Sequence, residues 1–299
     1  MNYLITGASG FIGKHLVKLL LARGDTVNYF GRRRSAELDS RAAFFPWNIA
    51  EEPRLDCMGQ LDAVIHLTGE PIAQRWNAEI KRRLYSSRVE STRNLVSAIG
   101  KLRVKPSILI SGSGAGYYGE RGDEVLTEDS GPGKGFISDL CINWEKEALR
   151  ATEFGVRVVP IRISIVLGPG GGALEQMAAP FQFGLGGKLG NGRQWMPWID
   201  IHDLARLMIH AANETSLRGP VNGCSPNPVT NAEFTRDLAS TLHRPALFTV
   251  PKFALTVAMG EVATHILESM RVIPKAAQQS GFQFDFPTLR EALASSLKH

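Results

Sequence analysis

The sequence contains few of the residues that staple or anchor a protein. It has three cysteines, Cys57, Cys141 and Cys224, and no Cys-x-x-Cys pair. An odd number of widely spaced cysteines argues against a disulfide framework and against a zinc site. No apolar run is long enough to cross a bilayer. We therefore expect reduced thiols, no bound metal and no membrane partner.

Charge of one sign is also scarce. The net charge is +5, and basic residues are dispersed apart from residues 32–34, all arginine, and a weaker group at 81–83. A nucleic-acid-binding surface needs a dense basic stripe, so we expect no nucleic-acid partner and favour a pocket for one phosphate group at 32–34. The chain starts directly with a strand, and no charged segment and apolar run precede it, so we expect no signal peptide and a cytoplasmic location.

The residues that are present indicate an α/β protein. Hydrophobic residues make up 43% and charged residues 21%, as in soluble globular proteins. Over the first half, short apolar runs alternate with amphipathic segments that predict helices at 11–23 and 87–102. The predicted strands are 3–6, 26–30, 63–67, 107–111 and 156–161. This alternation predicts βαβ units and a Rossmann-type, doubly wound parallel sheet.

The composition changes after Leu167. Glycine-rich segments at 168–172 and 184–192 flank a predicted helix at 173–183, and the remainder mixes helices with proline-containing turns. We interpret residues 1–167 as a dinucleotide-binding domain. Residues 168–299 would form mainly a smaller substrate lobe, with some segments returning to the first domain.

A glycine-rich loop follows the first predicted strand and opens the first helix. Gly7 allows a tight turn, Gly10 allows close approach of a pyrophosphate, and Gly13 lets the helix approach the sheet. The helix N-terminus supplies N–H donors for phosphate oxygens. The loop predicts a dinucleotide site whose further contacts are Ser9, Phe11 and Ile12.

The end of the second predicted strand selects the cofactor. A site for NAD places a carboxylate there to bind the ribose 2′-hydroxyl. This strand instead ends in Gly31, Arg32 and Arg33, and no carboxylate occurs before Glu37. Guanidinium groups bind a 2′-phosphate in two-point contacts and stack on adenine. We predict NADP(H) rather than NAD, the alternative being that these arginines are only surface charge.

Several segments resemble a known family. The loop at 6–13, the strand at 62–67, and Ser113 ahead of Tyr118-Gly119 resemble the extended short-chain dehydrogenase/reductases of the NAD(P)-dependent epimerase/dehydratase superfamily. Further segments resemble an atypical branch of this superfamily, the "epimerase family" proteins of unassigned activity. These segments are 67–72, 114–119, 162–173, 192–201 and 224–226. The resemblance implies a small-molecule substrate and allows a homodimer.

The resemblance also implies further cofactor contacts. Leu67, Thr68 and Gly69 would line the cofactor beyond the fourth strand, and Ile163 and Ser164 would flank the nicotinamide.

Two nearby residues are less clear from the sequence. Arg88 would reach toward the cofactor or would be a surface helix charge. His66, on the buried strand before the loop, is interpreted as a packed residue rather than a base.

The catalytic signature of the superfamily is absent. A Tyr-x-x-x-Lys normally supplies the acid/base, with the lysine charge lowering the tyrosine pKa. Here Phe136 aligns with the tyrosine and Leu140 with the lysine. Ser113 lies at the expected strand end. Tyr117 and Tyr118 follow it, and one of them either replaces the missing donor or packs a loop over the cofactor.

Three residues are candidates for substrate binding. Glu70 follows a strand end, where ligands gather in such sheets, and is either a base or a solvated loop acid. Arg193 and Gln194 lie beside two tryptophans in the substrate lobe. Arg193 would hold a phosphate or carboxylate, or would fix its glycine-rich loop.

Two functions fit the sequence. The first is an NADP(H)-dependent oxidoreductase or epimerase acting on a small polar, sugar-like substrate, as the intact cofactor loop and substrate lobe indicate. The second is a non-catalytic NADP(H)-binding sensor, as the missing tyrosine and lysine indicate.

Overall fold

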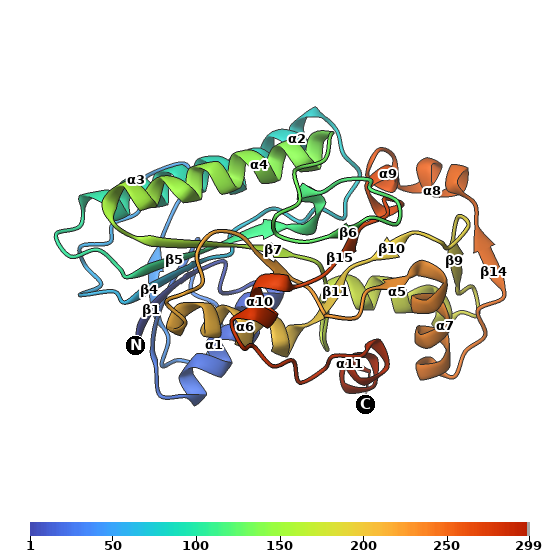
Figure 1. The fold of residues 1–299 in the computed structure, drawn as a ribbon. Helices are drawn as coiled ribbons and strands as arrows, with labels where there is room; N and C mark the ends of the chain where they lie inside the picture. The colour runs from blue at the N-terminus through green and yellow to red at the C-terminus, as the bar shows by residue number, and fades with distance from the viewer. Residues whose placement is uncertain (298–299) are drawn as a thin grey trace.

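The computed structural model describes residues 1–297, and its centre is a parallel sheet of seven strands (Figure 1). All neighbouring strands in this sheet run parallel. From edge to edge the order is β12 (Val221–Gly223), β7 (Arg157–Ile163), β5 (Ile108–Gly114), β4 (Ala63–His66), β1 (Asn2–Thr6), β2 (Thr26–Gly31) and β3 (Ala43–Pro46). The predicted Rossmann-type sheet is confirmed, and the order reverses at β1 and β4, where such sheets bind ligands.

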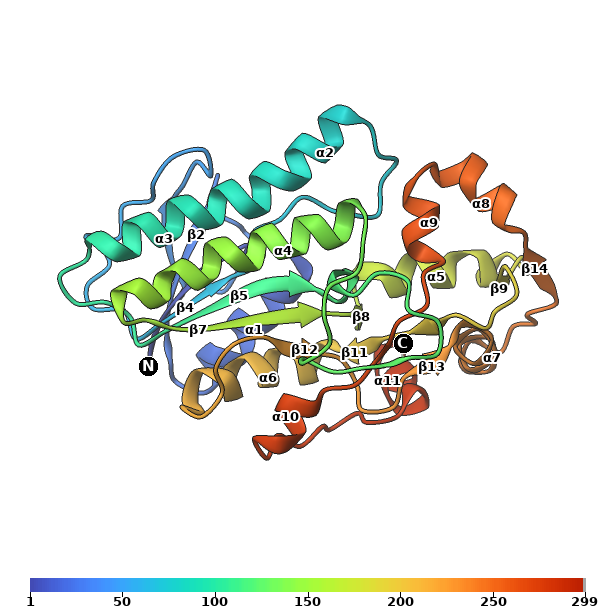
Figure 2. The ribbon, with the colours of Figure 1, turned by 45° about the horizontal axis from the view of Figure 1, so that its top comes forward.

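Helices cover both faces of the sheet (Figures 1 and 2). One face carries α4 (Phe136–Leu149) and a long helix made of α2 (Ala78–Tyr85), the π-helical turn η1 (Ser86–Glu90) and α3 (Ser91–Lys101). The other face carries α1 (Phe11–Ala22) and α6 (Ile201–Asn213). The helix expected at 87–102 is therefore the second half of a longer one.

The alternation of side chains along a strand builds a core on each face. Tyr3 and Ile5 on β1 belong to the apolar cluster that includes α1 and α6. Leu4, between them, belongs to the cluster that includes Leu95 and Ile99 of α3. All three strand residues are fully buried, as expected for a sheet covered on both sides.

The smaller lobe has its own core, centred on Trp198, Phe234 and Leu238. Its elements after β8 (Ile165–Leu167) are α5 (Gly172–Gln182), β9 (Gly187–Leu189), β10 (Trp195–Met196), β11 (Trp198–Asp200), β13 (Val229–Thr230), α7 (Asn231–Leu242), β14 (Phe248–Val250), α8 (Lys252–Met259), α9 (Val262–Ile266), β15 (Arg271–Val272) and α11 (Leu289–Ser296). The helix α10 (Lys275–Gln279) instead packs on β12 of the main sheet. Between β5 and β7 lie η2 (Ala115–Tyr117), β6 (Val125–Leu126) and η3 (Arg150–Phe154).

Two further elements beyond residue 167 pack on or extend the main sheet and its helices. The helix α6 packs on α1, and β12 extends the main sheet beside β7. Within residues 1–297 no helix is both long and apolar enough to cross a membrane. The same residues contain no group of three His, Cys, Asp or Glu side chains placed to hold a metal ion.

Candidate functional site

The glycine loop lies at the carboxyl end of β1 and opens α1. Gly7 has a φ of 71°, and the amide of Gly10 donates to the Gly7 carbonyl at 3.0 Å. A Cβ on Gly13 would lie 2.3 Å from the Gly7 oxygen, so the helix can approach the loop only with glycine there. No side chain caps α1, and its first turn holds no acidic residue. Its amide donors, those of Phe11 and Ile12 included, are thus suited to phosphate oxygens.

The second strand ends where a 2′-phosphate would be recognised. Gly31 closes β2, and Arg32 and Arg33 follow it with exposed side chains. Neither arginine forms an ion pair with any residue in the described part of the chain. Ser9, in the glycine loop, is also exposed. These residues fit a phosphorylated ribose, which needs free guanidinium donors.

The segment after β4 lies directly against the glycine loop. A Cβ on Gly7 would come within 2.7 Å of the Leu67 carbonyl, and the Thr68 amide donates to Thr6 Oγ1 at 3.3 Å. His66 is fully buried, with Nδ1 2.6 Å from Thr6 Oγ1. Burial lowers the pKa of His66 to about 3, so it is a neutral packed residue, as interpreted from the sequence.

Arg88 is buried next to this segment. A Cβ on Gly69 would lie 3.0 Å from Arg88 Cζ, and the guanidinium lies 5.3 Å from the centre of the Trp144 ring. Its Nε and Nη1 are buried without a hydrogen-bond partner among the described residues. Burial lowers the pKa of Arg88 to about 10. The alternative of a surface helix charge is therefore wrong, and the free donors suit a polar or anionic ligand.

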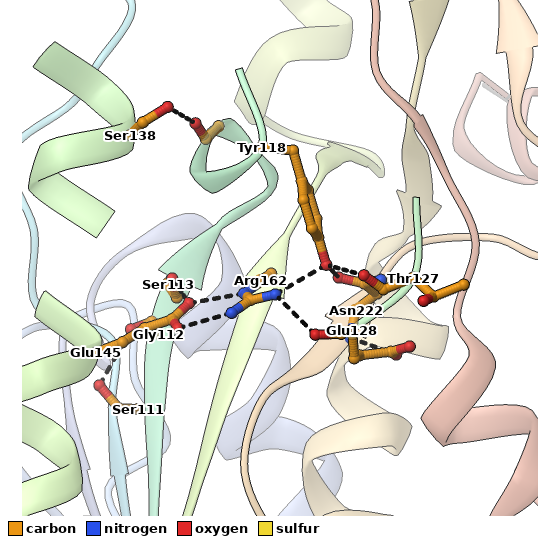
Figure 3. Close-up of polar contacts among 11 residues, drawn as sticks. Ser111, Gly112, Ser113, Tyr118, Thr127, Glu128, Ser138, Glu145, Arg162 and Asn222 are labelled. Atoms are coloured by element: carbon orange, nitrogen blue, oxygen red, sulfur yellow. Dashed lines mark hydrogen bonds and ion pairs between the residues drawn. The ribbon is translucent and has the colours of Figure 1, made fainter. Parts of the chain in front are cut away.

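A buried polar network connects β5, α4 and β7 (Figure 3). Ser113 Oγ donates to Glu145 Oε1 at 2.6 Å. Arg162 reaches the same carboxylate through Nε at 2.9 Å and Nη2 at 3.0 Å. Burial lowers the pKa of Arg162, but the hydrogen bonds and charge of Glu145 outweigh this and raise it above its usual range. Because the only proton of Ser113 is directed at Glu145, its oxygen faces other ligands as an acceptor.

The two tyrosines after Ser113 occupy different environments. Tyr118 is fully buried, and its hydroxyl accepts from Arg162 Nη1 at 2.9 Å (Figure 3). The one proton of this hydroxyl lies between two acceptors, Asn222 Oδ1 at 2.7 Å and the Thr127 carbonyl at 3.0 Å. Burial raises the pKa of Tyr118 above its usual range. Tyr117 is half-buried, and its ring centre lies 3.5 Å from Arg162 Cζ. Of the two hydroxyls, that of Tyr117 is more accessible to a ligand.

The helix α4 presents different residues to the site than we predicted from the sequence. Phe136, aligned there with the tyrosine, packs against Trp76 and lies under Lys81. Ile137 Cγ2 would meet a Cβ on Gly116 at 2.4 Å, and Cys141 Sγ would meet one on Gly114 at 3.4 Å. The positions that face β5 are thus Ile137 and Cys141, one residue later than the expected Phe136 and Leu140.

Cys141 is buried, and the pKa of its thiol is raised to about 12 by that burial. Neither Ile137 nor Cys141 supplies an acid or base near neutral pH.

The remaining candidates are spread over both lobes. Ile163 ends β7, and Ser164 Oγ donates to the Gly223 carbonyl at 2.7 Å. Glu70 lies 3.3 Å from Arg83 Nη2 and accepts from Gln74. In the substrate lobe, Gln194 is buried and donates to the Leu189 carbonyl, whereas Arg193 is exposed. The side chain of Gln194 thus stabilises its own loop. The candidates of this paragraph lie in different parts of the two lobes.

Sequence reasoning missed Glu145, Arg162 and Asn222 as parts of the site. The usable signal was Arg162 directly after the apolar run Val158-Val159-Pro160-Ile161, because a charge placed in a buried strand requires a partner. Nothing in the sequence indicates which acid that partner is, since Glu145 lies on a helix 17 positions earlier.

The sheet and the glycine loop together define a dinucleotide-binding α/β protein. A family model described as the NAD dependent epimerase/dehydratase family matches residues 3–222, and one described as a domain of unknown function matches residues 250–296. The chain belongs to the NAD dependent epimerase/dehydratase family.

Individual relatives confirm the predicted branch. The epimerase family protein SDR39U1 homolog of Arabidopsis thaliana, described as chloroplastic, is 40% identical over 100% of this chain and 87% of its own length. YfhF of Bacillus subtilis is 35% identical over 98% of this chain and 97% of its own. The human SDR39U1 crystal structure, solved with NADPH, is 35% identical with a TM-score of 0.90 and 99% coverage of both chains. The cytoplasmic location and the homodimer stay predictions.

Proposed function

We propose that this protein is an NADP(H)-dependent oxidoreductase or epimerase acting on a small polar, sugar-like substrate. The choice of NADP(H) as cofactor is supported by two features together, the uncapped N-terminus of α1 and the exposed Arg32 and Arg33 at the end of β2. The human relative crystallised with NADPH supports the same choice.

The residues of the site fit the cofactor in three places. The glycine loop and the start of α1 would hold the pyrophosphate, and Arg32 and Arg33 the 2′-phosphate. Arg88, with buried donors that lack a protein partner, would bind a polar group of the cofactor near Gly69. When bound, the cofactor supplies hydride chemistry, and the protein supplies orientation and a proton.

The substrate class is supported by the shape of the fold. A separate lobe with its own core lies beyond the carboxyl ends of the strands, where substrates bind in such sheets. A relative that is 30% identical, with a TM-score of 0.81, is described as the nucleoside-diphosphate sugar epimerase of Corynebacterium glutamicum; the match covers 99% of this chain and 58% of that one. Ser113, an acceptor at the end of β5, suits a hydroxyl group of a sugar-like molecule.

A fluorescence titration with NADPH and NADH tests the cofactor. The wild type should bind NADPH more tightly than NADH. Arg32→Asp should remove most of that difference, because it replaces a guanidinium by a charge that repels the 2′-phosphate. Arg54→Asp, the same charge change in a distant exposed loop, serves as the control and should leave both affinities unchanged. Equal affinity of the wild type for the two cofactors would sink the assignment of NADP(H).

The sensor alternative is favoured by one observation, the apolar Ile137 and the inert Cys141 at the positions of α4 that face β5. A panel of sugar aldehydes and nucleotide sugars, followed by NADPH absorbance and by product analysis, separates the two functions. Turnover of any compound supports an enzyme. Tight NADPH binding with no turnover across the panel supports the sensor.

A further inference from the structure

A histidine–glutamate pair in the smaller lobe belongs to no function assigned above. His265 lies on α9, and Glu268 follows that helix. His265 Nδ1 and Glu268 Oε2 are 2.6 Å apart, and the two side chains are 20% and 18% exposed. The other imidazole nitrogen, Nε2, forms no hydrogen bond with any residue that the structure describes.

The pair lies against η2, the turn that follows the carboxyl end of β5. A Cβ on Gly116, in η2, would lie 2.9 Å from His265 Cε1 and 2.4 Å from Ile137 Cγ2. The imidazole therefore packs on the same glycine as Ile137, which occupies the position on α4 that faces β5. On its other side, the imidazole stacks at 6.5 Å on Trp76 from the first domain.

Hydrogen bonds fix this pair relative to the first domain. Ser269, directly after Glu268, donates from its amide to Glu120 Oε2 at 2.7 Å and from Oγ to the Gly122 carbonyl at 2.7 Å. The Arg121 amide donates to the Ser269 carbonyl at 3.0 Å. Residues 120–122 follow Tyr117 and Tyr118 after one glycine, so the segment that carries Glu268 is bound to the loop that carries the tyrosines.

We propose that His265 is the proton donor and acceptor of this site, oriented by Glu268, and that it replaces the tyrosine that the family uses. A carboxylate only accepts hydrogen bonds, so Glu268 keeps a proton on Nδ1 and leaves Nε2 to exchange a proton with the ligand. The same division of roles operates in triads in which an acid orients a histidine.

The reaction that we assign to His265 is the reduction of a carbonyl group. The carbonyl carbon gains a hydride from NADPH, which leaves as NADP⁺, and the carbonyl oxygen takes the Nε2 proton of the imidazolium. The imidazole then regains a proton from water. The inference rests on the proposed function, because it assigns the proton of a reaction that the cofactor would drive.

A kinetic experiment tests the role with NADPH and D-glyceraldehyde, a small polar hydroxyaldehyde. His265→Gln should lower kcat by about 10²–10⁴-fold and leave the Kd for NADPH unchanged within about twofold. Added imidazole should partly restore the turnover of His265→Ala, which a merely structural role of the side chain would not allow. His243→Asn, an exposed histidine with a left-handed backbone that asparagine tolerates, is the control. Wild-type rates in His265→Gln, with activity abolished in Tyr117→Phe, would overturn the proposal.

A second measurement decides the proposal even if the wild type reduces no aldehyde. Long-range ¹H–¹⁵N spectra of the NADPH complex at about pH 8, assigned with His265→Gln, should show Nδ1 protonated and Nε2 bare. Glu268→Gln should weaken that tautomer preference. The opposite tautomer in the wild type would overturn the role of His265. Failure of the proposed function would appear separately, as a wild type that binds NADPH and turns over nothing.

Discussion

Arg162 on β7 and Glu145 on α4 form a two-point ion pair inside the protein, with side chains only 3% and 8% exposed. The pair holds Ser113 from one side, and the guanidinium lies under the ring of Tyr117 on the other. A strand, a helix and a loop at the carboxyl end of the sheet are therefore tied together by one buried charge pair.

Breaking this pair should be costly. Glu145→Gln leaves the Arg162 charge buried without its counter-ion, which we expect to lower the free energy of unfolding by about 3–5 kcal/mol. Arg162→Met should cost a similar amount, and the double change Glu145→Gln with Arg162→Met should cost less than the sum of the two single losses. Urea denaturation of the four proteins gives the coupling energy. Additive losses would show that the two charges do not stabilise each other.

The two tyrosines should differ in stability when each loses its hydroxyl. Tyr118→Phe removes the one donor available to Asn222 Oδ1 and the Thr127 carbonyl at this position, which we expect to cost about 1–3 kcal/mol. Tyr117→Phe keeps the ring over Arg162 and removes a hydroxyl with no hydrogen-bond partner among residues 1–297, so we expect a change within about 0.5 kcal/mol. Thermal denaturation of this matched pair is the measurement, and equal losses would contradict the assigned environments.

We expect Arg88 to contribute more to the affinity for NADPH than to the stability of the ligand-free protein. Its buried Nε and Nη1 have no protein partner, so Arg88→Met should not destabilise the ligand-free protein strongly. The rise in Tm that saturating NADPH gives the wild type should shrink in this variant, because ligand stabilisation depends on affinity. Arg88→Lys, which keeps the charge but lacks the planar fork, should fall between the two. An unchanged rise in Arg88→Met would remove Arg88 from the cofactor site.

Acid should destabilise the protein through His66. Burial holds its pKa at about 3 in the folded state, below the usual histidine value of 6.5. The unfolded state therefore binds the extra proton first, and stability that is complete above pH 6.5 falls by about 1.4 kcal/mol per pH unit between pH 6.5 and 3.

His66→Gln should reduce the dependence of the free energy of unfolding on pH. At pH 8, where the imidazole is neutral in both states, the variant should be less stable than the wild type only through its lost packing and hydrogen bond. Denaturant titrations across this range measure the slope. An identical slope in the two proteins would mean that another group causes the acid loss.

Local features of this protein could be predicted from the sequence, and contacts across the chain could not. The spacing of the glycines in the loop was readable because Gly10 and Gly13 each avoid a clash with the loop itself, whereas the contact of Gly7 with Leu67 joins distant segments. Arg162 and Glu145 meet only because β7 lies beside β5 under α4, an arrangement that no local pattern encodes.

In α4, an alignment error of a single residue was enough to assign the wrong side chains to the site. A shift of one residue rotates a side chain by roughly 100° around a helix, so expecting Phe136 in place of Ile137 moves the position from the sheet to the face that meets Trp76. His265 was missed for a larger reason. Its contact with Gly116 joins two lobes, and their relative placement is set by the whole small-lobe fold.

The return of β12 to the edge of the main sheet determines how the protein can be dissected. A truncation after Leu167 looks natural from composition, but it would strip the β7 edge of its neighbour and uncover the face of α1 that α6 protects. Such a fragment would carry an open strand edge and a bare apolar surface, the two features that drive self-association. Expression of the nucleotide-binding half alone should therefore give aggregates, and the gene should be cloned and evolved as one unit.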